Sequence, residues 1–538
     1  MSSNAEQVPD ANKNNDQNDD KSENNKKKGP LSEEEKARYT ELKAQELEEK
    51  NKLLDSHSKS MELQRQKKAA LEAQLAALKK QLDDRYAAMM ENQAVIDERN
   101  EKIDSELKEN EEDEDSNLHF CRTVTVKAPM NIALVKYWGK RDVNLNLPLN
   151  SSLSATLDVN VMNSETTIET SKYLRRDEIS LNGEEYKAIP KNSRLATVIR
   201  ELRFMARREH GRVKWSKNPE DGGKDTFEFK DNHLPPSFFS QKIRIKSQNN
   251  FPTAAGLASS ASGFAALTFA VAHLYNLGGG NISLYKKYVG RLSAIARQGS
   301  GSAARSMLGG FVVWNKGESP EGEDSIAEEF ECWNHWPNLR FVICVANEEK
   351  KSVPSTAAMI RSQKTSTLLE HRVSKVADQI LELTKKNIKT KNFAALSELI
   401  MRDSNQLHAI CQDSFPPIEY LNETSRKIID MVHRYNGQTG KKCLAYTFDA
   451  GPNAVLVTTN DHLDDVCTLV KRHFAEEDAD DDDFFMEGSL ERFSGAPIEL
   501  ENFEGKQGGV KFAIVTQIGP GPKVINDAFE VFDDRDNQ

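Results

Sequence analysis

The chain has 538 residues, of which 37% are hydrophobic, and carries a formal net charge of −11. This length suggests about three or four structural units, and the acidic balance argues against nucleic acid as the main partner. The sequence contains no apolar run long enough to span a membrane, and its polar N-terminus lacks the apolar core of a signal peptide.

The cysteines indicate a reducing compartment. They are widely spaced and form no C-x-x-C pair, at Cys121, Cys332, Cys344, Cys411, Cys443 and Cys467. Such spacing is typical of reduced structural thiols. The C-terminal residues Asp536-Asn537-Gln538 are not the Ser-Lys-Leu peroxisomal signal. We therefore expect a cytoplasmic protein.

The first 116 residues differ from the rest of the chain. Residues 1–30 are rich in Asn, Asp, Lys and Ser, and this composition predicts disorder. Good helix formers predominate from residue 31 to about Leu107, without Gly or Pro. We predict a long helical arm over residues 31–116, with an acidic hinge at Glu106–Asp115.

A seven-residue repeat runs along this arm. It is apolar except at Lys68, and its positions are Leu47, Leu54, Met61, Lys68, Leu75, Leu82, Met89, Ile96 and Ile103. The companion seam is apolar at Leu71 and Leu78 and polar at His57, Gln64, Arg85, Asn92 and Arg99. One apolar seam and one mostly polar seam favour a coiled coil that needs a second copy or a partner helix for residues 31–110. A solvated single helix is the alternative.

From about Asn117 the sequence is typical of globular domains. The predicted strands are Thr123–Val126, Leu153–Val161, Thr166–Thr170, Lys242–Lys246, Phe311–Trp314, Phe341–Ala346, Leu444–Phe448, Ala454–Thr458 and Lys511–Thr516. The predicted helices are a buried one from Leu257 onward, Thr356–Lys385, Phe393–Ile410 and Ser425–Tyr435. Arg207–Ser237 is predicted to be a surface excursion, and Glu476–Asp483 a solvated acidic insertion. We assign one domain to residues 117–325 and another to residues 326–538, of α/β and α+β type.

Three loops combine small residues with hydroxyls or cations. Their candidate residues are, in chain order, Lys136 and Lys140; Gly256, Ala258, Ser259 and Ser260; and Ser300, Ser302 and Arg305. Hydroxyls, cations and the N–H groups of a helix start bind phosphates. Each loop taken alone also fits an ordinary turn or a solvated lysine. The second loop lacks the Gly-Lys-Ser/Thr sequence of the Walker loop.

A fourth segment, Tyr446–Ala454, places Asp449 between an apolar strand and a Gly-Pro turn. A carboxylate held there beside basic loops is suited to general-base catalysis. An aspartate that closes an Asx turn is the alternative.

Taken together, four stretches resemble the diphosphomevalonate decarboxylases of the GHMP kinase superfamily. They are A-P-M-N-I-A-L-V-K-Y-W-G-K-R-D, N-F-P-T-A-A-G-L-A-S-S-A-S-G-F, A-R-Q-G-S-G-S-A-A-R-S and Y-T-F-D-A-G-P-N-A, in this order. The second stretch alone indicates only the superfamily, whereas W-G-K-R-D and F-D-A-G-P-N-A indicate the decarboxylases. The resemblance extends from about Arg122 to about Pro522. It implies a two-domain GHMP-kinase-like fold, α/β plus α+β, with an active-site cleft between the domains, and a homodimer.

The resemblance also implies a reaction: ATP- and Mg²⁺-dependent conversion of mevalonate 5-diphosphate to isopentenyl diphosphate, ADP, phosphate and CO₂, in isoprenoid and sterol biosynthesis. Asp449 would take the proton of the 3-hydroxyl, Arg305 would hold the substrate carboxylate, and Lys136 would lie near the transferring phosphate. The 5-diphosphate would be held by Tyr137, Lys140, Ser300 and Ser302, with Asn131 close by. The ATP phosphates would be held by Gly256, Ala258, Ser259 and Ser260, and Ser260 would help to place Mg²⁺.

Two departures from the family are visible. Ala304 occupies a position where family members often have Cys, and the helical arm has no counterpart in the family's catalytic domain. Two other functions remain open: a related kinase that phosphorylates the 3-hydroxyl without decarboxylation, and a coiled-coil scaffold with a degenerate enzyme domain. Asp449 and Arg305 argue against the kinase, and the intact loop residues argue against the scaffold.

Overall fold

The computed structural model describes residues 33–108, 118–210, 234, 236–251, 259–277, 282–346, 353–477, 479, 484–486 and 498–533. The chain divides into two compact units, residues 1–95 and 96–538. Among the described residues, no helix is both long and apolar enough to cross a membrane. The predicted disordered tail lies outside the described residues, as does most of the predicted hinge, surface excursion and acidic insertion.

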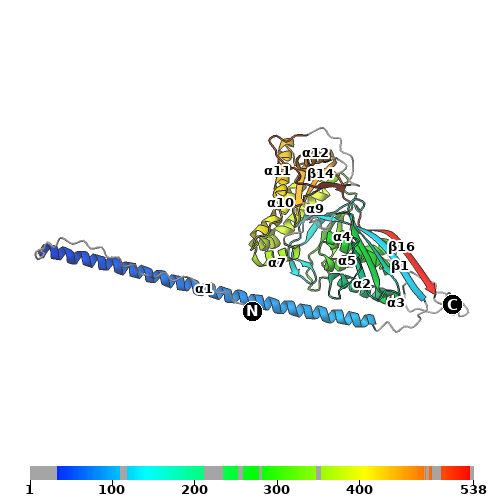
Figure 1. The fold of residues 1–538 in the computed structure, drawn as a ribbon, viewed down its shortest axis with the longest axis horizontal. Coiled ribbons are helices and arrows are strands. Elements are labelled where there is room, and N and C mark those ends of the chain that lie inside the picture. The colour runs from blue at the N-terminus through cyan, green and yellow to red at the C-terminus, as the bar shows by residue number, and fades with distance from the viewer. Residues whose placement is uncertain are drawn as a thin grey trace, which may run out of the picture. The chain divides into compact units, whose positions relative to one another are not determined.

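A single helix of 76 residues, α1 (Glu33–Lys108), makes up the described part of the first unit and continues past its boundary (blue in Figure 1). The prediction of a long helix is therefore confirmed. Ion pairs one turn apart, such as Lys52–Glu48 and Lys59–Asp55 at 2.8 Å each, support the helix locally.

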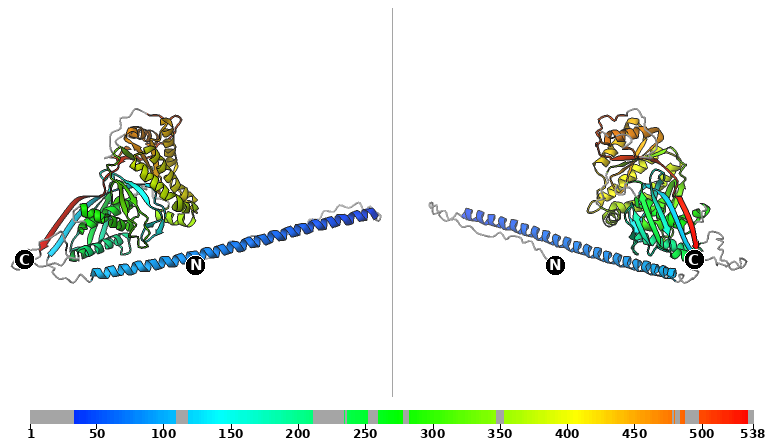
Figure 2. Two further views of the ribbon diagram at one scale, coloured as in Figure 1. Left: turned by 180° about the vertical axis from the view of Figure 1, so that it is seen from behind. Right: turned by 45° about the vertical axis from the view of Figure 1, so that its right-hand side comes forward.

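A six-stranded sheet forms the centre of the first globular half. Its order is β16 (Lys523–Asp533), β1 (Leu118–Pro129), β6 (Asn163–Thr170), β9 (Ile243–Asn249), β7 (Glu178–Leu181), β8 (Lys187–Ala188). The pairing of β16 with β1 is antiparallel, and the two strands run side by side in Figures 1 and 2. The last strand of the predicted second domain, residues 326–538, therefore belongs to the sheet of the first half.

Two four-stranded sheets carry the segments that form the site. One has the order β11 (Ala327–Glu331), β10 (Phe311–Trp314), β5 (Ser152–Thr156), β2 (Asn131–Val135), and the other has the order β13 (Leu444–Phe448), β14 (Ala454–Thr459), β12 (Leu339–Val345), β15 (Phe512–Gln517). A small ribbon pairs β3 (Lys140–Asp142) with β4 (Leu147–Pro148). The predicted strand Leu153–Val161 is too long, because the chain turns at Asp158, whose carboxylate accepts the N–H of Asn160 at 2.9 Å.

Helices cover these sheets. In the first half they are α2 (Arg194–His210), α3 (Pro236–Ser240), α4 (Ser259–Leu274), α5 (Ile282–Gly299) and α6 (Ala303–Ser306). In the second half they are α7 (Ser355–Thr365), α8 (Thr367–His371), the π-turn η2 (Arg372–Val376), α9 (Ala377–Lys389), α10 (Phe393–Asp413), α11 (Glu423–Thr439), the 3₁₀ turn η3 (Asn460–His462) and α12 (Leu463–Phe474).

The predicted continuous helix Thr356–Lys385 is wrong. Ser366 is extended, and its side chain accepts the N–H of Leu369 and donates to Asp413 at 2.7 Å. A serine that caps a new helix start ends the preceding helix. The segment is further interrupted by η2, so four short elements replace one long helix.

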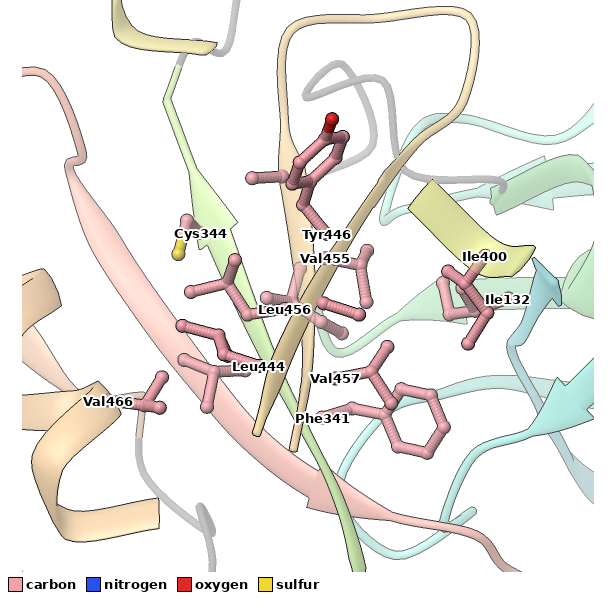
Figure 3. Close-up of a cluster of buried hydrophobic side chains, with 14 of the residues drawn as sticks. Ile132, Phe341, Cys344, Ile400, Leu444, Tyr446, Val455, Leu456, Val457 and Val466 are labelled. Atoms are coloured by element: carbon pink, nitrogen blue, oxygen red, sulfur yellow. The ribbon is translucent and has the colours of Figure 1, made fainter. Parts of the chain in front are cut away.

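One hydrophobic core extends across both globular halves. It contains Ile132 of β2, Ile400 of α10 and Val457 of β14. Figure 3 shows Ile132 and Ile400 beside each other at one side of this cluster. Because β2 and α10 pack into the same core, the residues that follow β2 have a defined position relative to the second half.

Close packing of α5 on α4 brings two predicted loops together. Gly299 ends α5, and a Cβ added there would come within 2.1 Å of the Phe264 ring of α4. Gly299 is followed directly by Ser300, so this contact determines how near Ser300 lies to the start of α4.

We expect Gly299→Ala to lower the melting temperature. The added methyl group must displace Phe264 or separate the two helices, and such overpacking costs about 1–3 kcal/mol. Gly437→Ala in α11 is the matched control, because an added Cβ there meets no described atom within 4 Å. The control should gain up to about 1 kcal/mol from helix propensity. Thermal unfolding followed by circular dichroism measures both; a Gly299→Ala protein as stable as the wild type would contradict the close packing.

Candidate active site

An ion pair between the two globular halves lies at the centre of the candidate site. Lys136 directly follows β2, and Asp449 directly follows β13. The Nζ atom of Lys136 lies 2.6 Å from Oδ1 of Asp449; the lysine side chain is 2% exposed and the aspartate side chain 40%. A buried ammonium needs a compensating charge, and the half-exposed carboxylate supplies it at the surface of the site.

Arg305 of α6 is held by a buried polar network. Its Nη1 donates to Ser152 at 2.6 Å and its Nε donates to Asn131 at 3.2 Å, while the guanidinium lies 5.7 Å from the ring centre of Trp314. Burial lowers the pKa of Arg305 to about 10, and the negative charge of Asp449 opposes this shift. The arginine is still a cation at neutral pH, with an orientation suited to a carboxylate.

Asn131 connects this arginine to the third loop. Its amide nitrogen donates to the carbonyl of Ser302 at 3.1 Å and to the hydroxyl of Ser306 at 2.8 Å. Three of the predicted residues, Asn131, Ser302 and Arg305, therefore form one bonded group.

Tyr137 carries a buried hydroxyl for which the described residues offer no hydrogen-bond partner. Its ring packs edge-on against Trp314 with ring centres 4.8 Å apart, and burial raises the pKa of its hydroxyl. A Cβ on Gly301 would lie 3.1 Å from the hydroxyl oxygen, so the third loop passes close to the ring. A buried donor without a partner is costly, and this one is satisfied if a ligand oxygen binds there.

Lys140, at the start of β3, is a second buried cation. Its ammonium donates to Asn146 at 2.6 Å and to Thr356 at 3.4 Å. Burial lowers the pKa of Lys140 to about 8, and the positive charge of Arg194 adds to this effect. The charge of Arg194 also acts on Tyr137. Several cations therefore favour an anionic ligand between these residues.

The second and third loops meet at their serines. Ser260, in the first turn of α4, lies with its hydroxyl oxygen 3.1 Å from that of Ser300. The carbonyl of Ser259 accepts from the Ser262 hydroxyl at 3.3 Å. Gly256 and Ala258 lie outside the described residues. The helix start and its hydroxyls fit phosphate oxygens.

The described residues contain no group of three or more His, Cys, Asp or Glu side chains that could hold a metal ion. A tight all-protein metal cage is therefore absent from this part of the chain. Mg²⁺ is usually held by a few protein oxygens, ligand phosphates and water. The Ser260 hydroxyl fits as one such oxygen, so the donors present suit Mg²⁺ that arrives with a nucleotide.

Sequence reasoning missed several residues of this site. They are Asn146, Ser152, Arg194, Ser306 and Trp314. Ser306 had a weak local signal, because it ends the small-residue stretch A-R-Q-G-S-G-S-A-A-R-S, whereas Ser152 lies outside all four stretches. Arg194 and Trp314 had none, because each is an ordinary helix or strand residue that approaches the site only through folding.

Two family models match most of the globular part of the chain. Residues 128–327 match the diphosphomevalonate decarboxylase-like N-terminal domain, and residues 341–525 match the mevalonate 5-diphosphate decarboxylase C-terminal domain.

Individual proteins agree with these matches. The chain is 43% identical over 412 residues to diphosphomevalonate decarboxylase of Danio rerio, which covers 76% of this chain and 94% of that protein. A crystal structure of mevalonate 5-diphosphate decarboxylase superposes with a TM-score of 0.62 at 37% identity, covering 75% of this chain and 97% of the other. A structure of MDDEF in complex with MVAPP, AMPPCP and magnesium has a TM-score of 0.54 at 28% identity, covering 76% and 99%.

We expect anion binding at Lys140 to weaken as the pH rises through about 8. Because its pKa is lowered, Lys140 of the ligand-free site loses its proton, and with it its positive charge, at a lower pH than an exposed lysine does. In Lys140→Arg the cation persists, because guanidinium does not titrate in this range. Calorimetric titration with inorganic pyrophosphate from pH 6.5 to 9.5 tests this.

At each pH the dissociation constant of the wild type is divided by that of Lys140→Arg. Ionisation of pyrophosphate affects both constants equally and therefore cancels in this ratio. The ratio should rise about tenfold per pH unit above 8. A ratio that stays constant across this range would show that Lys140 does not titrate at the anion site.

Proposed function

This chain belongs to the diphosphomevalonate decarboxylase family, and we propose that Asp449, Lys136 and Arg305 carry out its ATP-dependent decarboxylation of mevalonate 5-diphosphate. The activity is a step of the mevalonate pathway of isoprenoid biosynthesis.

The observation that supports it best is the 2.6 Å pair between Lys136 and Asp449. A base must be ionised before it can accept a proton, and an adjacent ammonium favours the ionised carboxylate. Asp449 is the more exposed partner, so the carboxylate can be reached by the 3-hydroxyl of the substrate. Lys136 also places positive charge where the transferred phosphoryl group gains negative charge.

The reaction then follows from phosphorylation of a tertiary alcohol. Asp449 takes the proton as the hydroxyl oxygen bonds to the γ-phosphorus of ATP. The bond from that phosphorus to the oxygen shared with the β-phosphate breaks, ADP leaves, and the former hydroxyl is now a phosphate leaving group. The C3–O bond breaks, phosphate departs with the electron pair, and C3 becomes electron-poor. The bond from C2 to the carboxylate then breaks, its electrons form the double bond, and CO₂ leaves. Arg305 holds that carboxylate in line for this step.

The remaining residues bind the two phosphate-bearing ligands. Tyr137, Lys140, Ser300 and Ser302 surround the 5-diphosphate, and the unpartnered Tyr137 hydroxyl supports this assignment. The start of α4 with Ser259 and Ser260 binds the ATP phosphates, together with Gly256 and Ala258. The Ser260 hydroxyl would help to hold Mg²⁺, which would supply positive charge to the phosphates. The complex of MDDEF with MVAPP, AMPPCP and magnesium supports the same set of ligands for this chain.

The boundary between the catalytic domains and the cellular compartment are also proposed. We place the boundary of the two catalytic domains near residue 325, supported by family models that end at 327 and begin at 341. A cytoplasmic location is supported by the six cysteines, which all lie in the described residues as free thiols.

The helical arm is proposed to associate with a second copy of the chain. Its repeat leaves apolar side chains in solvent: Leu47 is 61% exposed, Leu54 60% and Met61 45%. Burial of this seam against an identical helix removes that apolar surface from water. The alternatives are a partner helix from another protein and a single helix held by its i,i+4 ion pairs. A homodimer of the catalytic domains, as the family resemblance implies, would be a separate contact.

We expect Asp449→Asn to lower kcat by about 10²–10⁴-fold, because the amide cannot accept the hydroxyl proton. ¹⁴CO₂ release from carboxyl-labelled substrate and ADP formation measure the two halves of the reaction. Asp461→Asn, an exposed aspartate of η3, is the control and should retain full activity. Near-normal turnover by folded Asp449→Asn would refute its role as base. Wild-type ADP formation without CO₂ would favour the kinase alternative.

We expect Leu47→Glu/Leu54→Glu/Met61→Glu to lower the mass of the full-length chain in sedimentation equilibrium, because charge on the seam opposes helix pairing. Gln45→Glu/Ser56→Glu/Gln66→Glu adds the same charge along the same stretch of helix, at positions away from both seams, and should leave the mass unchanged. A wild type that sediments as a monomer would rule out self-association through the arm, and a pull-down for a partner helix would follow.

A further inference from the structure

We propose that two consecutive residues of α10, Asp403 and Ser404, position the Lys136–Asp449 pair by binding the backbone of the two segments that carry it. The inference rests on the proposed function, in which this pair is catalytic. Asp403 and Ser404 are positioning residues, because they act on the reacting pair through hydrogen bonds to the protein backbone.

Each residue binds one of the two segments. Asp403 accepts the backbone N–H of Lys136 with its Oδ2 at 2.6 Å, and Ser404 accepts the backbone N–H of Phe448 with its Oγ at 2.9 Å. Phe448 is the residue before Asp449. Asp403 and Ser404 are both fully buried. One helix turn therefore connects the main chain on both sides of the ion pair.

Both N–H groups lie where the sheets leave them without a strand partner. β2 ends at Val135, so the N–H of Lys136 is beyond its ladder with β5. β13 is an edge strand whose neighbour is β14 on one side, and α10 packs against it. Buried N–H groups need acceptors. The helix supplies them with side chains, and thereby determines where each segment ends.

Arg372 completes the hold on Lys136. Its Nη1 and Nη2 lie 2.7 and 3.2 Å from the two carboxylate oxygens of Asp403, and its Nη2 also donates to the carbonyl of Lys136 at 3.0 Å. Asn150 donates to the same carbonyl at 3.1 Å. The N–H and the C=O of Lys136 are thus both bound by one buried ion pair.

A buried ion pair is an expensive way to stabilise a fold. Arg372 and Asp403 are both 0% exposed, so both charges are fully desolvated. Apolar residues of similar size often stabilise a core as well or better. The pair instead provides directed bonds to the N–H and the C=O of one residue, Lys136. Arg372 also opens the π-turn η2, an irregularity that is frequent near functional sites.

Positioning matters here because the reacting pair spans two halves of the protein. Lys136 and Asp449 are 313 residues apart in sequence, and each is at the end of a strand in a different sheet. A catalytic group displaced by about 1 Å loses about 10²-fold in rate. α10 is also anchored through Ile400 in the core shared with β2, so it can transmit a fixed geometry to both strand ends.

The test compares Ser404→Ala with Ser397→Ala. Ser397 is equally buried on α10, but its hydroxyl donates to Ala394 within its own helix. We expect Ser404→Ala to lower kcat about tenfold with KM values for both substrates within about twofold of wild type. Ser397→Ala should keep kcat within about twofold. Asp403→Asn retains an acceptor oxygen for Lys136, and a loss of kcat smaller than that of Asp403→Ala would support the backbone contact.

The pH profile of kcat distinguishes a positioning role of Ser404 from a role in protein stability alone. Among the described residues, Lys136, Arg305 and His408 are charged or titratable groups that act on Asp449. If Ser404→Ala lets Asp449 move away from Lys136, the acid limb should shift up by about 0.5–1 pH unit. The proposal would be overturned if Ser404→Ala and Ser397→Ala lowered Tm equally and Ser404→Ala kept the kcat and the acid limb of the wild type.

The outcome is distinguishable from a failure of the proposed function. If wild type releases CO₂ and Asp449→Asn does not, the function stands, and a normal Ser404→Ala enzyme refutes positioning alone. If Asp449→Asn remains active, the catalytic pair itself is wrong, whatever Ser404→Ala does.

Discussion

The ion pair between Lys136 and Asp449 is the interaction on which the rest of the site depends. It joins two chain segments that follow strands of different sheets, and it takes an ammonium almost completely out of water. Such a charge is tolerable only with a partner at short range. The fold therefore has to bring both strand ends to one place, and the shared core around Ile132 and Ile400 provides the framework for this.

The same constraint explains the polarity of the surrounding core. The chain is acidic overall, with a net charge of −11, yet Lys136, Lys140 and Arg305 are all buried around the site. Burial lowers the pKa of Lys140 and Arg305, as expected where cations are close together and poorly solvated. Ligands that carry phosphates and a carboxylate, as in the proposed function, would supply the missing negative charge. The site is therefore electrostatically incomplete until its substrates bind.

Around this pair, side-chain hydrogen bonds replace the regular ladders of the sheets. Asn131 connects the first strand of the site to the loop of Ser302, and α10 takes up the free N–H groups where two strands end. Each bond is modest in energy. Together they restrict the backbone around Lys136 and Asp449. Most of the arm belongs to a separate compact unit, residues 1–95.

The sequence by itself determined the family and most strands, and it indicated the candidate site residues, because motifs such as W-G-K-R-D and F-D-A-G-P-N-A are local. It also determined the long helix α1, whose composition contains no helix breaker. Only the tertiary structure decided that Ser366 interrupts a predicted helix and that β16 returns to β1. It also decided that Asp403 binds the N–H of Lys136, 267 residues away, and that Ser404 binds the N–H of Phe448, 44 residues away. These features are contacts between distant segments, and local periodicity carries no information about which buried N–H group a side chain will meet.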